Sequence, residues 1–233
     1  MSETQEKSVW RPILPVPAEV FPRPAEHKAR KKPYWTYEYR DLNGNLLGYE
    51  DVFFTSTGER LLLPLTWCED QHGARGWRWI QFQRMRPIFG LDTLGYVEPY
   101  TDAEIDDAAG RGEVLSPRAA QLDLQRDVVI CFDAHAAADA RRLLPFAALS
   151  WPGGIKNIDD VDWALLRGLK NVWIWPPKTA DRMKVRANEE GEGLVMTRDK
   201  QSAWKAVRKL EAHLVGFGVN IVGVIDPFSD DDV

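Results

Sequence analysis

The chain has 233 residues, of which 44% are hydrophobic and 28% are charged, and its formal net charge is −5. This composition is typical of a soluble globular protein with one large domain or two small ones, and it argues against a surface that is positive throughout. Apolar runs stay well below the roughly 20 residues that span a bilayer, and the polar start contains no signal-peptide core. We therefore expect a cytoplasmic protein with no membrane partner.

The first part of the chain is rich in proline and then in aromatic residues. Six prolines fall within residues 1–33, where they exclude a long helix or an inner strand, so we predict an extended arm or linker. Residues 34–100 alternate apolar and polar side chains, and turn signals such as Asp41-Leu-Asn-Gly-Asn45 separate the runs. The pattern predicts a small antiparallel β-rich domain.

Residues 101–126 carry a helix-start signal and then a loop. Thr101 is followed three positions later by Glu104, the spacing of a capping box, so a short helix is expected to begin here. The following Arg-Gly-Glu-Val-Leu-Ser-Pro stretch is typical of a loop. We interpret this region as a connection between two domains.

Strand and helix signals alternate through residues 127–227, before an acidic tail at 228–233. This order predicts an α/β domain with a parallel sheet and flanking helices. The expected strands cover residues 128–132, 146–151, 171–175 and 219–225. The expected helices cover residues 135–144, 159–169 and 199–216, and a charged loop is expected at 184–193.

The first of these strands runs into an acidic turn, where α/β sheets usually hold ligands and metals. Asp133 follows the strand, and His135 and Asp139 lie one helical turn apart just after it. Asp133 is suited to capping the helix through its carboxylate. Alternatively, Asp133 and Asp139 could form a rearranged metal site with Asp181. The next comparable turn, Trp175-Pro-Pro-Lys-Thr179, holds no acid.

Several segments, in their order and spacing, resemble a known family over about residues 10–180. The segments are Trp35-Thr-Tyr-Glu-Tyr-Arg-Asp-Leu-Asn-Gly-Asn-Leu-Leu-Gly-Tyr49, Leu63-Pro-Leu65, Trp77-Arg-Trp79, Arg86-Pro-Ile-Phe-Gly-Leu-Asp92, Pro152-Gly-Gly154, Asp162-Trp163 and Val172-Trp-Ile-Trp-Pro176. They resemble the primase region of phage, plasmid and genomic-island replication proteins, in which a small β-rich domain precedes a Toprim domain. The resemblance implies a Toprim-like parallel sheet in the second half of the chain.

The resemblance also implies where a catalytic site would lie. The family's acid/base glutamate falls on Asp133, and its Mg²⁺-binding Asp-x-Asp pair falls on Pro177 and Thr179. Mg²⁺ prefers hard oxygen ligands, which proline does not supply, and Lys178 brings a positive charge to the same turn. We therefore expect a catalytically degenerate site that binds no cofactor, with Mg²⁺ at a rearranged acidic site as the alternative.

The second turn and the β-rich part also offer candidates for binding phosphate or nucleic acid. Lys178 and Thr179, with Gly153 and Gly154 of the neighbouring turn, could hold a phosphate, or the turn could be a remnant without a ligand. Aromatic side chains stack on bases while cations meet phosphates, which is typical of single-strand binding. The candidates for that role are Lys31, Lys32, Tyr37, Tyr39, Trp77, Arg78, Trp79, Arg84 and Arg86.

We therefore expect a catalytically degenerate, primase-like accessory protein of a mobile genetic element. Its expected partners are single-stranded DNA or a primer-template, and a replication helicase or polymerase on a separate chain. One alternative is a Mg²⁺-dependent nucleotidyl transferase or nuclease with a rearranged acidic site. The other is a protein-interaction module in defence or regulation.

Overall fold

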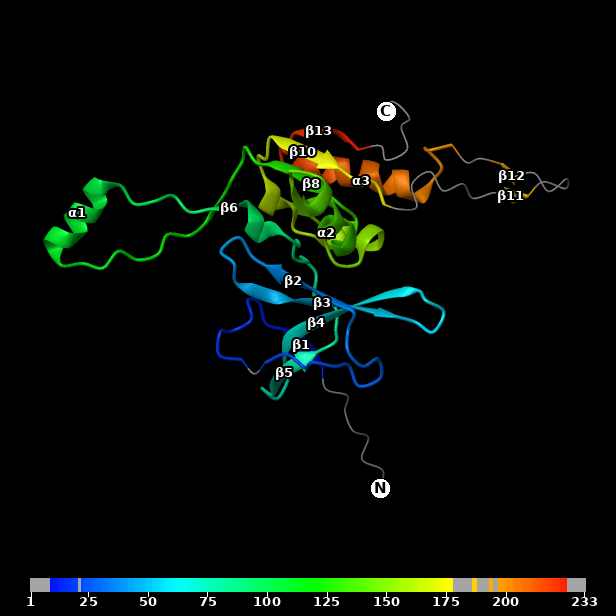
Figure 1. Ribbon diagram of the computed structural model, residues 1–233, viewed down its shortest axis with the longest axis horizontal. Coiled ribbons are helices and arrows are strands. Elements are labelled where there is room, and N and C mark those ends of the chain that lie inside the picture. The colour runs from blue at the N-terminus through cyan, green and yellow to red at the C-terminus, as the bar shows by residue number, and fades with distance from the viewer. Residues whose placement is uncertain (1–8, 21, 178–185, 188–192, 195–196, 226–233) are drawn as a thin grey trace, which may run out of the picture.

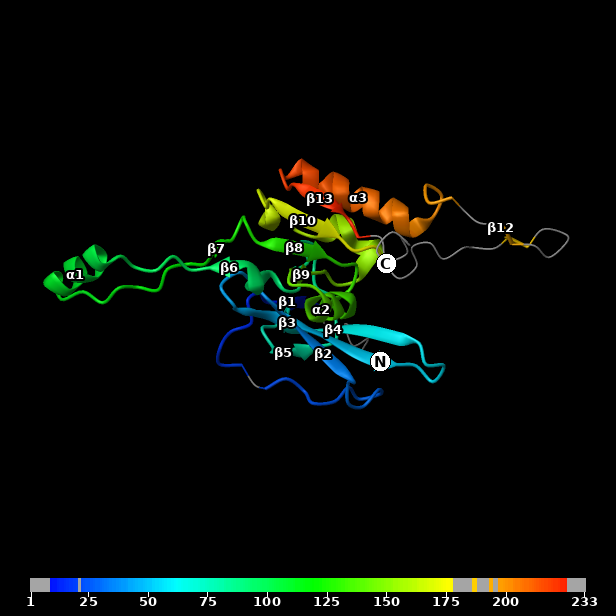
Figure 2. The same cartoon turned by 45° about the horizontal axis from the view of Figure 1, so that its top comes forward.

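The computed structural model describes residues 9–20, 22–177, 186–187, 193–194 and 197–225 (Figure 1). An antiparallel sheet from the first part of the chain and a parallel sheet from the second part lie on either side of helix α2 (Ala134–Leu143). Helix α3 (Ser202–Gly216) covers the other face of the parallel sheet (Figure 2). The expected mixed α/β class is confirmed at this level.

The antiparallel sheet has the strand order β1-β4-β3-β2, and β5 also pairs with β4. Its strands are β1 (Trp10–Pro12), β2 (Trp35–Arg40), β3 (Leu46–Phe54), β4 (Arg60–Asp70) and β5 (Arg75–Arg78). β1 belongs to the proline-rich segment and pairs along the end of β4. Its Pro12 lacks a backbone N–H, which suits an edge position better than an inner strand.

The parallel sheet has four short strands in the order β13-β10-β8-β9. They are β8 (Asp127–Ile130), β9 (Ala147–Leu149), β10 (Asn171–Ile174) and β13 (Ile221–Val224). Each neighbouring pair runs parallel, as the alternation of strand and helix signals predicts. All four strands are shorter than expected, by one to three residues each.

The two faces of strand β8 separate the core into two clusters, because side chains alternate along a strand. Val128 and Ile130 belong to the cluster that contains the apolar face of α3. Val129 and, just beyond the strand, Cys131 belong to the cluster that joins the alanines of α2 to Tyr39 of the antiparallel sheet. The parallel and antiparallel sheets therefore share a core through α2.

One predicted helix is wrong. Residues 159–169 do not form an α-helix, and two short 3-10 helices, η2 (Gly154–Asp160) and η3 (Trp163–Leu166), occupy this part of the chain. Val161 between them is extended, and it forms an isolated bridge with Arg86. This pairing with a distant segment interrupts the helix. The charged loop expected at 184–193 contains strand β11 (Arg186–Ala187), which pairs with β12 (Gly193–Leu194).

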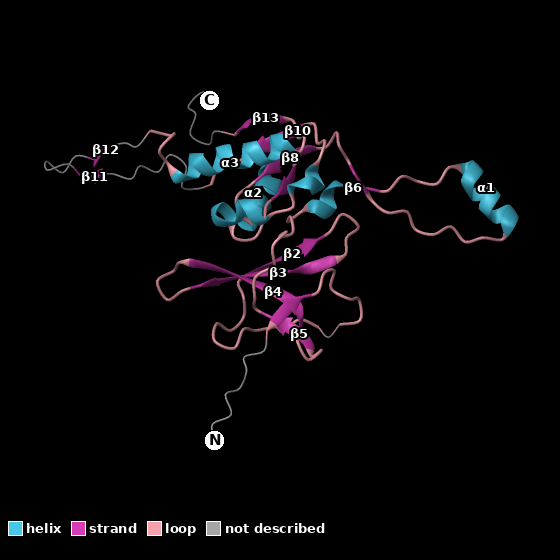
Figure 3. Ribbon diagram, turned by 180° about the vertical axis from the view of Figure 1, so that it is seen from behind, coloured by secondary structure: helices cyan, strands magenta, loops and turns pink. Residues whose placement is uncertain are grey.

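A hairpin-like arm extends from the body of the molecule (Figure 3). After the 3-10 helix η1 (Leu91–Leu94), strand β6 (Gly95–Tyr96) pairs with β7 (Gln121–Leu122) and closes its base. Helix α1 (Asp102–Arg111) lies at its far end and carries the predicted Thr101–Glu104 capping box. Among the described helices, none has the length and apolar character to cross a membrane.

Candidate nucleic-acid interface

In the acidic turn after β8, the Asp133 carboxylate forms hydrogen bonds that stabilise the fold. One carboxylate oxygen of Asp133 accepts a hydrogen bond from the Ala136 backbone N–H at 2.8 Å, which caps α2. The other accepts one from the Arg60 guanidinium at 3.0 Å. The capping role predicted for Asp133 is confirmed, and Arg60, at the start of β4, already places a positive charge beside this carboxylate.

The neighbouring His135 and Asp139 share a helix face, as their spacing predicts, and each also has a partner of its own. The Tyr37 hydroxyl hydrogen-bonds His135 Nδ1 at 2.7 Å, while His135 Nε2 lies 3.7 Å from the Asp139 carboxylate. Asp139 also pairs with Arg142. Within the described residues, no group of three or more His, Cys, Asp or Glu side chains could hold a metal ion. Asp181, the third member of the alternative metal site, lies outside the described residues.

The turns that follow β8, β9 and β10 meet at one edge of the parallel sheet. The Trp175 backbone N–H donates to the Ile130 carbonyl at 2.9 Å, which sets the end of β10 beside the end of β8. A Cβ on Gly154 would lie 2.7 Å from the Phe132 carbonyl oxygen, so the close contact of this turn with the β8 end requires glycine. Gly153 precedes it with φ 85° and is exposed. Lys178 and Thr179 lie outside the described residues.

Glu50 lies behind the acidic turn and is 2% exposed. Glu50 lies opposite Tyr37 in the pairing of β2 with β3, so its side chain faces α2. The buried Tyr39 hydroxyl donates a hydrogen bond to the Glu50 carboxylate at 3.2 Å. The pKa of the Glu50 carboxyl is raised to about 7, chiefly by burial and also by the nearby Asp133 charge, while the Tyr39 hydrogen bond and the Arg60 charge lower it. The interface between the two sheets therefore holds a carboxyl that titrates near neutral pH.

At the rim of this interface, three aromatic rings form an exposed surface, which we call the aromatic platform. Its members are Tyr34, Trp35 and Phe54, which are 67%, 48% and 38% exposed. The ring of Phe54 lies 4.9 Å from that of Tyr34 and 6.0 Å from that of Trp35. The centre of the Trp35 ring also lies 5.6 Å from that of the His135 ring, so the platform adjoins the first turn of α2.

A cluster of cations precedes the platform in the chain, and we call residues 27–32 the basic turn. His27 organises it: its backbone pairs with Lys31, and its Nδ1 accepts from the N–H groups of Ala29 and Arg30. Lys31 adopts φ 64°, an uncommon conformation for a residue other than glycine. The exposed cations of this turn are Lys28, Arg30, Lys31 and Lys32, and no ion pair involves them within the described part of the chain.

The two tryptophans predicted to stack on bases have structural partners instead. The Trp77 ring packs 5.6 Å from Trp67 and 5.5 Å from Tyr49. The Trp79 indole donates to the buried Asp51 carboxylate at 3.3 Å and lies against the His27 ring. Both rings are only partly exposed and take part in the packing of the antiparallel sheet, and their role as stacking residues stays a prediction.

The three arginines that were predicted to bind phosphates differ in their exposure and in their partners. Arg78 lies over the Trp10 ring at 3.7 Å and donates to the Trp77 carbonyl, which ties β1 to β5. The Arg86 side chain is 11% exposed and donates to Gln81 at 2.8 Å. Only the Arg84 side chain, which is 80% exposed and 3.9 Å from Asp160, is open to a ligand. Of the predicted cations that the structure describes, Arg84, Lys31 and Lys32 are exposed.

Sequence reasoning missed the platform and Arg60. The run Tyr34-Trp35 follows the basic turn after Pro33 alone, and this closeness of cations and aromatic residues in the chain was the available signal. Arg60 carries no such signal, because its contact with Asp133 spans 73 residues. Family models and curated proteins were both compared with the chain, and neither comparison finds a match.

Proposed function

We propose that this protein is a non-catalytic, primase-like accessory protein that binds single-stranded DNA through the basic turn and the aromatic platform. The observation that carries the proposal is a run of exposed residues in the chain: four cations without an ion pair among the described residues come just before Tyr34 and Trp35, whose exposed rings meet that of Phe54. Base stacking contributes about 1–3 kcal/mol per base, and it tolerates any sequence because every base has a flat face. Cations beside the rings suit the phosphates between successive bases.

The state of the acidic turn supports a binding role over a metal-dependent one. Asp133 is engaged by the α2 backbone and by Arg60, which leaves a neutralised carboxylate where the resemblance to Toprim proteins expects an acid/base group. The neighbouring β8 and β10 ends suit a Toprim-like arrangement, but Pro177 supplies no ligand there. We propose that such a protein serves a replication helicase or polymerase of a mobile genetic element on another chain.

The test is a salt titration of binding to a labelled single-stranded oligothymidylate, followed by fluorescence anisotropy. The logarithm of affinity falls with the logarithm of salt with a slope of about −0.7 per neutralised phosphate. We expect the variant K28Q/K31Q/K32Q to bind more weakly and to lower this slope by about 2. The matched control K170Q/K200Q/K205Q removes three exposed charges elsewhere and should bind as the wild type does. Equal binding by both variants would refute the proposal.

A further inference from the structure

Helix α1 stands at the end of the arm with one face uncovered by any described residue. Of its ten side chains, only that of Ala108 is buried, and the neighbouring Val97 and Val114 are 53% and 94% exposed. Figures 1 and 2 both show the helix well away from either sheet. A short isolated helix is marginal in water, so this one depends on contacts within the arm.

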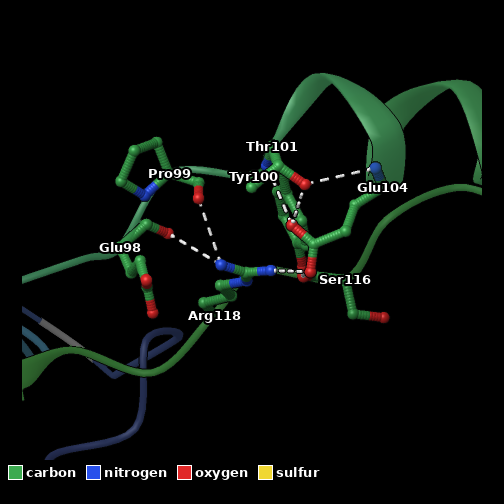
Figure 4. Close-up of polar contacts among 7 residues, drawn as sticks. All are labelled: Glu98, Pro99, Tyr100, Thr101, Glu104, Ser116 and Arg118. Carbon is green, nitrogen blue, oxygen red and sulfur yellow. Dashed lines mark hydrogen bonds and ion pairs between the residues drawn. The ribbon is translucent and has the colours of Figure 1, made fainter.

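Polar contacts between the two sides of the arm set the orientation of the helix (Figure 4). Arg118, in the segment that returns from α1, donates to the carbonyls of Glu98 and Pro99 at 3.5 and 3.1 Å and pairs with the Glu104 carboxylate. Its guanidinium lies 4.1 Å from the centre of the Tyr100 ring. The Tyr100 hydroxyl in turn donates to the Ser116 carbonyl, so the two sides of the arm are joined at the helix base.

The two faces of α1 carry different side chains. Glu104, Ala108 and Arg111 follow the spacing of one face, and the first two of them meet the returning segment. Another face, at the spacing i, i+3, i+4 and i+7, consists of Asp102, Ile105, Asp106 and Ala109. Ile105 is 47% exposed there, and among the described residues the two aspartates form no ion pair. We call these four residues the outer face of α1.

We propose that the outer face of α1 docks on the basic turn and aromatic platform of a second copy of this chain. The charges are complementary, since two unpaired carboxylates would meet unpaired lysines. The apolar parts also match, since the exposed Ile105 would meet exposed rings such as Trp35. Phosphate-bearing ligands are poor occupants of this face, because the aspartates repel them.

The positions of the two surfaces require the contact to form between two copies of the chain, in head-to-tail order. Figures 1 and 2 both place α1 and the turn between β3 and β4 at opposite ends of the molecule. Phe54 of the platform ends β3 at that turn, so an arm cannot reach its own platform. A contact between two different surfaces of one chain is heterologous and can add further copies. The association needs no nucleic acid and does not depend on the proposed function, although single-stranded DNA would compete for the same surface.

Two variants with one defective surface each provide the test, by sedimentation velocity without nucleic acid. The arm variant D102N/I105S/D106N and the turn variant K28Q/K31Q/K32Q are each expected to be monomeric. Their equimolar mixture should form a one-to-one dimer that grows no further, because one intact arm meets one intact turn. The wild type should form larger species at low salt and dissociate at about 1 M salt, where the screening length is about 3 Å.

The control variant D127N/L143S/E211Q changes the same kinds of side chain elsewhere and should associate as the wild type does. Far-UV circular dichroism should show that every variant keeps its fold. A monomeric wild type, or a mixture of the two variants that stays monomeric, would overturn the proposal. So would an arm variant that associates as strongly as the wild type.

Discussion

The guanidinium of Arg60 donates to the carboxylate of Asp133 at 3.0 Å and thereby joins the start of β4 to the first turn of α2. Both side chains are about one-quarter exposed. The carboxylate thus has a cation beside it and a backbone N–H on its other oxygen. This pairing makes the turn part of the interface between the two sheets.

Removing the Asp133 side chain should destabilise the fold more than removing its charge. Asparagine caps helices about as well as aspartate, so Asp133→Asn should lose only the ion pair, about 1 kcal/mol or less. Asp133→Ala also loses the cap and should cost about 1–3 kcal/mol in the free energy of unfolding. Urea unfolding of both variants measures the difference. Equal losses would show that the cap to Ala136 contributes nothing.

Trp35→Ala should weaken binding of single-stranded DNA by about 1–3 kcal/mol, because one stacking surface of the platform is removed. Trp35 is 48% exposed and contacts Phe54 and His135, so the substitution should also lower the free energy of unfolding, and urea unfolding should show that the variant is folded in the binding assay. Tyr96→Ala serves as the control, because Tyr96 is 51% exposed on β6, away from the platform. Anisotropy titrations at one fixed salt concentration compare the three proteins. An equal effect of both substitutions would exclude a stacking role specific to the platform.

The parts of the fold that depend on neighbouring residues were predictable from the sequence. The Thr101–Glu104 capping box was confirmed because both partners lie within one turn of the same helix. The alternation of strands and helices in the second half was confirmed as a parallel sheet, because βαβ order leaves few other arrangements. The cap formed by Asp133 was predictable for the same reason, since its donor, the Ala136 backbone N–H, is three residues away.

Contacts between distant segments decided the rest. The helix expected at 159–169 fails because Val161 pairs with Arg86, 75 positions earlier in the chain. Trp77 and Trp79 look like stacking residues in the sequence, but their partners Trp67 and Asp51 come from other strands. The exposure of Trp35 depends on its place at the rim of β2, which requires the register of the sheet.

The buried Glu50 should make stability depend on pH. Below the unfolded pKa near 4.5 both states hold the proton, and between about 4.5 and 7 only the folded state holds it. The free energy of unfolding should therefore fall as pH rises through this window, by an amount on the order of 3 kcal/mol. Glu50→Gln cannot ionise and should lack this component.

Urea unfolding from pH 5 to 8 tests this dependence. The stability of Glu50→Gln relative to the wild type should increase with pH, because the wild type alone bears the rising cost of a buried charge. Glu211→Gln, at a partly exposed position on α3, should show no such trend. A constant difference between the wild type and Glu50→Gln would mean that Glu50 ionises normally in the fold.

Two glycines with the same backbone conformation should respond differently to alanine. Gly44 and Gly90 have φ 82° and 81°, but a Cβ on Gly90 would lie 2.5 Å from the Ala148 carbonyl oxygen, whereas Gly44 has no neighbour within 4 Å. Gly44→Ala should cost about 1–2 kcal/mol from the left-handed conformation alone. Gly90→Ala should cost about 1–3 kcal/mol more, because the backbone must move. Thermal or urea unfolding distinguishes the two, and similar losses would contradict the close approach of η1 and β9.

The most direct test is the affinity of the wild type and of Asp133→Asn for single-stranded DNA, measured in Mg²⁺ and in EDTA at one ionic strength. We expect both proteins to bind with the same affinity in both buffers, because the basic turn and the platform lie outside the acidic turn. Binding that requires Mg²⁺ and is lost in Asp133→Asn would show that the carboxylate acts on a metal ion and would contradict a metal-independent interface.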